Sequence, residues 1–118
     1  MRFVTSVRNA ARGIRAALKS ERHMRFHFFA AVVVLIIGWI LKFSSIEWAI
    51  LLIVIIGMMA LELVNTALET LVDLVEPDQH PVAGKVKDIA AGACLVFAIG
   101  AAIIGFILFI PKLIDLLV

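Results

Sequence analysis

The chain has 118 residues, which is short enough for a single domain, and 64% of them are hydrophobic. Soluble domains are roughly 45–50% apolar, and a soluble chain of this length could not bury so much apolar surface. Together with a mean hydropathy of +1.12, this composition excludes a soluble globular protein and indicates an integral membrane protein. The formal net charge is only +2, and the single cysteine, Cys94, excludes an intrachain disulfide.

The N-terminal segment carries most of the positive charge of the chain. Its basic residues are Arg2, Arg8, Arg12, Arg15, Lys19, Arg22 and Arg25. They flank an apolar side formed by residues such as Phe3, Val7 and Ile14, which predicts an amphipathic surface helix over residues 1–25. No aromatic platform accompanies the basic residues, so we expect a membrane surface and not a nucleic acid as their partner. A simple anchor and a helix that helps to admit a lipid substrate fit this pattern equally well.

The first apolar run predicts a membrane-spanning helix over residues 28–46. The uncharged part, Phe28 to Leu41, is short for a span of about 20 residues. The span becomes long enough if Lys42 snorkels to the membrane surface and the helix continues to the Ser44-Ser45 turn and Ile46.

Two further spans are predicted over residues 46–76 and 81–110. Proline removes a backbone donor and disfavours helix before it, so Pro77 and Pro81 end the second span. Pro81 suits the first turn of the third span, and Pro111 is predicted to end that span. We therefore expect an all-α membrane protein with three spanning helices and an N-terminal surface helix, which together form one domain over residues 1–118.

The second span carries a stripe of polar side chains. Steps of three and four residues place its members on one helix face: Glu62, Asn65, Thr66, Glu69, Asp73 and Glu76. One acid at the centre of a spanning helix costs about 2.5–3.5 kcal/mol on insertion scales. Several acids on one helix therefore need a metal, a bound ligand or a neighbouring cation.

The stripe is compatible with two kinds of chemistry. In phosphoryl transfer, carboxylates bind a divalent metal or accept a hydroxyl proton, and a lysine such as Lys87 offsets phosphate charge. Proton or cation transport also uses buried acids. The sequence contains neither G-x-x-x-x-G-K-[ST] nor G-x-G-x-x-G, so no nucleotide-binding motif separates these alternatives.

Residues 62–73, Glu-Leu-Val-Asn-Thr-Ala-Leu-Glu-Thr-Leu-Val-Asp, resemble the signature of the small bacterial membrane kinases of lipid alcohols. That family comprises diacylglycerol kinase and undecaprenol kinase. Further similar blocks, at fitting spacings, are Ser20-Glu21-Arg22 with Arg25 and His27, His80-Pro81, Lys87-Asp88 and residues 90–93. The resemblance implies ATP-dependent phosphorylation of a lipid alcohol by a homotrimer whose active sites form between protomers. It also implies a multi-pass protein of the bacterial inner membrane, and the basic N-terminus predicts that this terminus and the active site are cytoplasmic.

The resemblance implies a role for each matching residue. Glu62 matches the proposed general base for the lipid hydroxyl, and Glu21 and Glu69 match the carboxylates that bind Mg²⁺. Nucleotide contacts are implied for Glu21, Asn65, Glu69, Asp78, Gln79, His80, Lys87 and Asp88. Asp73 matches an acid that shapes the site.

The choice of acceptor follows from finer similarities. His80-Pro81, the Ala-Gly-Ala at 91–93 and residues 109–113 resemble the undecaprenol kinase branch. The diacylglycerol kinase branch tends to have serine where this chain has Ala91. We therefore expect undecaprenol as the acceptor, with diacylglycerol as the alternative. Two non-enzymatic alternatives are a cation pathway lined by the same acids and a structural scaffold. His23 and His27 are expected to pack at the membrane interface.

Overall fold

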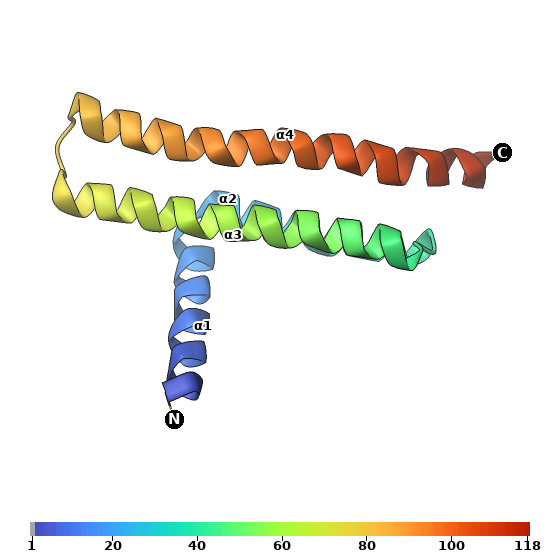
Figure 1. The fold of residues 1–118 in the computed structure, drawn as a ribbon, viewed down its shortest axis with the longest axis horizontal. Coiled ribbons are helices and arrows are strands. Elements are labelled where there is room, and N and C mark those ends of the chain that lie inside the picture. The colour runs from blue at the N-terminus through green and yellow to red at the C-terminus, as the bar shows by residue number, and fades with distance from the viewer. Residues whose placement is uncertain (1) are drawn as a thin grey trace.

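A computed structural model of the chain describes residues 2–118 and contains four helices over that range. They are α1 (Arg2–Ser20), α2 (Arg22–Ile40), α3 (Ser45–Val75) and α4 (Pro81–Leu117). Successive helices α2, α3 and α4 run antiparallel, and α1 lies crosswise to them (Figure 1). Each of α2, α3 and α4 is long and apolar enough to cross a membrane. The predicted all-α fold with three spanning helices is confirmed; Met1, which the predicted surface helix included, lies outside the described residues.

Helix α1 leaves its apolar side uncovered by protein. Phe3, Val7 and Ile14 are exposed, and Ala17 near the end of the helix is its buried residue. Only the C-terminal part of α1 reaches the rest of the bundle, as Figure 1 shows. An amphipathic helix that lies across the spans with a free apolar side fits the headgroup region of a bilayer.

The corner between α1 and α2 corrects one predicted boundary. The structure ends α1 at Ser20, whereas the predicted surface helix continued to residue 25. Glu21 has an extended backbone (φ −112°, ψ 117°) and begins α2. Nη1 of Arg25 donates to the carbonyl oxygens of Leu18 and Lys19, each at 2.9 Å. These carbonyls lie in the last turn of α1, where no intrahelical partner is available. Residues 22–25 consequently belong to the first spanning helix.

The turn between α2 and α3 also comes earlier than predicted, because α2 ends at Ile40 and not at residue 46. Lys42 adopts a left-handed backbone (φ 56°), and the Phe43 N–H donates to the Gly38 carbonyl at 3.1 Å. Ser44 then caps α3: its Oγ accepts from the Glu47 N–H at 3.2 Å, and its own N–H donates to Glu47 Oε1 at 2.9 Å. This reciprocal capping box fixes where α3 begins.

Aromatic and aliphatic side chains pack tightly around this turn, at what we call the packed end of the bundle. The buried cluster consists of Phe43, Leu51 and Leu108. The Phe43 ring lies 4.9 Å from the ring of Phe109 and 5.7 Å from that of Trp48, measured between centroids. A salt bridge of 3.3 Å between Lys112 and Glu47 adds a polar contact between α4 and α3.

Helix α4 does not end at Pro111, as the sequence predicted, but continues to Leu117. Proline removes one backbone donor and disturbs the preceding turn. Helices in membranes tolerate such residues because neighbouring groups satisfy the freed carbonyls. The prediction of the start was correct: Pro81 opens α4, and His80 Nδ1 accepts a hydrogen bond from the Val82 N–H at 3.1 Å.

The helix lengths indicate that one end of α3 and α4 extends beyond the hydrocarbon core of a bilayer. With 19 residues, α2 is about 28 Å long and matches a hydrocarbon core of about 30 Å. The 31 residues of α3 reach about 46 Å. Because the short turn keeps the start of α3 level with the end of α2, the extra length projects past α1, as Figure 1 shows. We call residues 64–91 the protruding end.

We expect Arg25→Ala to loosen the corner between α1 and α2, because the last carbonyls of α1 lose their donor. Hydrogen–deuterium exchange in detergent should become faster in residues 15–24 and stay unchanged in α3. Arg25→Lys should give an intermediate effect, since one ammonium group replaces a guanidinium fork. The exposed Arg22, changed to Ala, is the matched control; unchanged exchange in Arg25→Ala would contradict this role.

Candidate active site

Glu62 is the only buried charged residue in the part of the chain that the structure describes, with 6% of its surface exposed. Its Oε1 lies 3.2 Å from Nε2 of His27 on α2. Met24 is buried one turn before His27, and Met58 is buried one turn before Glu62. Both methionines are buried, so the contact between His27 and Glu62 joins α2 and α3 beside buried positions of both helices.

A buried carboxylate needs hydrogen-bond donors, because burial removes the water that would otherwise solvate it. The thiol of Cys94 on α4 lies within hydrogen-bonding range of Glu62 and also 3.7 Å from the Leu61 carbonyl oxygen. A thiol is a weak donor, so His27 is the stronger donor available to Glu62. Sequence reasoning expected this histidine only to pack at the interface, although it is an ionisable residue near the start of a span.

Asn65 and Glu69 follow Glu62 on the same face of α3, toward the protruding end. Asn65 Nδ2 donates to Glu69 Oε1 at 3.1 Å, and both residues are half-buried. Asn65 Oδ1 is buried without a hydrogen-bond partner among residues 2–118. The pair thus presents a free amide oxygen beside a carboxylate whose orientation is fixed by the amide nitrogen.

A polar cavity of about 590 Å³ lies between the last turn of α3, the loop and the first turns of α4. Predicted site residues that line it are Asp73, Asp78, Gln79, His80 and Lys87. Lys87 forms an ion pair with Asp73 across the two helices. The Asp73 side chain is largely exposed (61%) and that of Lys87 is partly exposed (37%), so this cavity faces water.

Two predicted site residues remain apart from these groups. Glu21 begins α2 through its backbone, and its side chain forms no capping hydrogen bond. Asp88 is exposed next to Lys87 and does not line the polar cavity. Sequence reasoning placed both with the nucleotide, and neither lines the polar cavity of this chain.

The side chains around Glu69 are compatible with Mg²⁺, although residues 2–118 hold no group of three or more His, Cys, Asp or Glu placed to bind a metal. Mg²⁺ usually takes one or two carboxylates from the protein and completes its shell with phosphate oxygens and water. The Glu69 carboxylate and the unpartnered Asn65 oxygen are hard oxygen donors of this kind. Such a small set of protein ligands suits an Mg²⁺ ion that binds together with a nucleotide.

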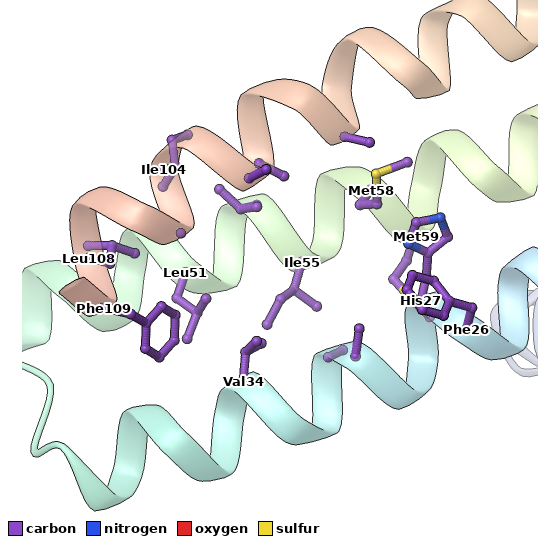
Figure 2. A pocket seen from close by; sticks show the side chains of 17 residues that line it. Phe26, His27, Val34, Leu51, Ile55, Met58, Met59, Ile104, Leu108 and Phe109 are labelled. Atoms are coloured by element: carbon purple, nitrogen blue, oxygen red, sulfur yellow. The ribbon is translucent and has the colours of Figure 1, made fainter. Parts of the chain in front are cut away.

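An apolar cavity of about 400 Å³ lies between α2, α3 and α4 (Figure 2). His27 and Phe26 stand at one end, and Phe109 and Leu108 stand at the opposite end, near Leu51. The Phe26 ring meets the His27 ring edge-on, with centroids 5.6 Å apart. His27 is the only ionisable residue in the lining, so the cavity suits an apolar chain whose polar end lies at His27 and Glu62.

Comparison with known proteins identifies the family. The sequence model of the prokaryotic diacylglycerol kinases matches residues 8–109. The chain is 48% identical to the undecaprenol kinase of Bacillus subtilis, over 95% of this chain and 91% of that protein. It is 40% identical to a diacylglycerol kinase of Synechocystis, over 98% and 67% of the two chains, and 28% identical to that of Escherichia coli K12, over 86% and 84%. The resemblance seen in residues 62–73 is confirmed, and the chain belongs to the prokaryotic diacylglycerol kinase family.

Proposed function

We propose that this lipid kinase transfers the γ-phosphoryl group of ATP to undecaprenol at the cytoplasmic face of the bacterial inner membrane. The observation that carries the choice of acceptor is the 48% identity to an undecaprenol kinase over 95% of the chain. Diacylglycerol is the second candidate, because a diacylglycerol kinase is 40% identical over 98% of the chain. Membership of a kinase family makes a cation pathway or a scaffold unnecessary to explain the buried acids.

In the proposed reaction, Glu62 is the general base. It lies beside His27, at the polar end of the apolar cavity, where the hydroxyl of a lipid alcohol would meet it if the tail occupied the cavity. The hydroxyl oxygen forms a bond to the γ-phosphorus, its proton passes to the Glu62 carboxylate, and ADP leaves with the electrons of the broken P–O bond. Proton removal by a positioned carboxylate contributes typically 10²–10⁴-fold to such reactions.

The nucleotide would extend from Glu62 toward water. Lys87, held by Asp73 at the rim of the polar cavity, is suited to a phosphate, and Asp78, Gln79 and His80 line the space beyond it. Glu62 and Asp73 are about 16 Å apart along the axis of α3, a gap that a triphosphate and its nucleoside can bridge. Glu69 with the Asn65 oxygen, and Glu21, would hold Mg²⁺, which neutralises charge on the β- and γ-phosphates when it is bound.

The assembly is proposed to be a homotrimer with active sites between protomers. Glu21 and Asp88 support this arrangement, because neither lines the polar cavity of this chain. A neighbouring copy could bring them to the nucleotide. The basic α1 and the lysines at the start of α4 favour a cytoplasmic location for the protruding end.

An acceptor comparison tests the proposed function. Purified protein in mixed micelles would receive labelled ATP with either undecaprenol or diacylglycerol at matched mole fractions. We expect a higher kcat/KM for undecaprenol, because finer sequence similarities favour that branch. A higher value for diacylglycerol would assign the second candidate, and no phosphorylation of either lipid would contradict both.

Changing Glu62 to Gln should lower kcat about 10²–10⁴-fold, because the amide cannot accept the hydroxyl proton. ATP binding should change little, since the base contacts only the acceptor. Initial rates and equilibrium ATP binding, measured on the same preparation, check both expectations. Glu69→Gln provides the contrast and should raise the Mg²⁺ concentration needed for half-maximal rate. Wild-type turnover in Glu62→Gln would show that another group is the base.

Lys87→Met should reduce kcat/KM for ATP about 100-fold or more, the usual cost of losing one charged group that stabilises a transferring phosphoryl. The melting temperature should stay the same, because such exposed ion pairs contribute only about 0–1 kcal/mol to stability. Asp73→Asn should also reduce kcat/KM for ATP, but by a smaller factor than Lys87→Met. Lys85→Met, on the same helix but outside the cavity lining, is the matched control; equal losses in Lys85 and Lys87 variants would argue against the assignment.

A further inference from the structure

We propose that His27 is a positioning residue for the kinase reaction, acting through Glu62. Its Nε2–H fixes one oxygen of the Glu62 carboxylate, so that the second oxygen is held toward the hydroxyl of the lipid alcohol. The inference rests on the proposed function of Glu62 as general base, and it adds a residue of α2 that contacts this base.

The hydrogen bond between the two side chains runs from His27 to Glu62. An ionised carboxylate only accepts hydrogen bonds, so the imidazole nitrogen 3.2 Å from Glu62 Oε1 must carry the proton. Among residues 2–118, the other side chain near the carboxylate is the Cys94 thiol, which is a weak donor and also contacts the Leu61 carbonyl. The imidazole is therefore the stronger of the two donors that orient the carboxylate.

The surroundings of the pair are buried. Met24, with 1% of its surface exposed, and Met58, with 7%, lie one turn away from His27 and Glu62. The edge-on contact with Phe26 restrains the imidazole ring itself. A catalytic group held in this way needs no reordering when the substrate binds, and a displacement of about 1 Å in such a group can cost about 100-fold in rate.

The position of His27 also links the base to the apolar cavity. His27 lines one end of the cavity, and Glu62, which is not part of the lining, contacts His27 from α3. Figure 2 shows the imidazole at this end, beside Phe26 and Met59. An alcohol whose tail follows the cavity would meet the imidazole before the polar loop. His27 is thus in position to align the base with the acceptor but not to contact the nucleotide.

A matched pair of amide substitutions tests the proposal. In His27→Gln the side-chain amide reaches the former position of Nε2, whereas in His27→Asn it is one methylene too short. We expect His27→Gln to keep kcat within about 5-fold of wild type and His27→Asn to lose about 10- to 100-fold. KM for ATP should stay unchanged in both. His23→Asn, four residues earlier and exposed, is the control and should behave as wild type.

Combination with Glu62→Gln separates positioning from packing. If His27 acts through Glu62, His27→Asn should cause no further loss of kcat in the Glu62→Gln background, because effects of residues acting as a unit are not additive. A purely structural histidine would lower activity by the same factor in both backgrounds and would lower the melting temperature in parallel. The additive result would overturn the proposal.

The remaining outcomes distinguish this inference from the proposed function. Wild-type kcat in His27→Asn, with Glu62→Gln inactive, would reject the role of His27 and leave Glu62 as the base. Wild-type kcat in Glu62→Gln would reject the base assignment itself. If His27→Asn does not fold, the folded His27→Gln variant still tests the proposal, because its side-chain amide keeps a hydrogen-bond donor beside Glu62. A loss of kcat of more than about 100-fold in that variant would overturn the proposal.

Discussion

A carboxylate on a membrane-spanning helix must find its hydrogen-bond donor within the protein, because hydrocarbon offers none. In this protein the contact between Glu62 on α3 and His27 on α2 meets this requirement, with the Cys94 thiol on α4 nearby. The rest of the fold brings these two side chains to the same depth. Arg25 holds the corner from which α2 starts, and the short turn after Ile40 fixes the register of α2 against α3.

The two ends of the bundle differ in packing and in polarity. At the packed end, Phe43 and its aromatic neighbours, a capping box and the contact between Lys112 and Glu47 lock the helices together. At the protruding end the side chains are mostly exposed, and the polar cavity is lined by a loop and a surface ion pair. The packed end therefore contributes apolar packing that the protruding end lacks. The protruding end can carry charged residues that serve the reaction, since ion pairs on the surface contribute little to the free energy of folding.

Much of this architecture follows from local sequence, and the exceptions have physical causes. Hydropathy and Pro81 predict the three spans and the start of α4, because both signals act within one segment. The break at Glu21 depends on a side chain in the next helix, and Pro111 is tolerated inside α4, so neither is visible in local propensity. Helical spacing correctly gathers Glu62, Asn65 and Glu69 on one face of α3. It cannot reveal His27, because spacing along one helix carries no information about which residue of another helix lies opposite.

The unequal lengths of α2 and α3 have a consequence for product release. If the acceptor is a neutral lipid alcohol, as proposed, its hydroxyl would enter at the depth of Glu62, near the first turns of α2. Phosphorylation converts that hydroxyl into an anion, whose burial away from water is strongly unfavourable. Hydration would thus draw the new headgroup along α3 toward the protruding end, while the tail stays in the bilayer. Phosphorylation itself would therefore favour release of the product headgroup from the site, without movement of a lid.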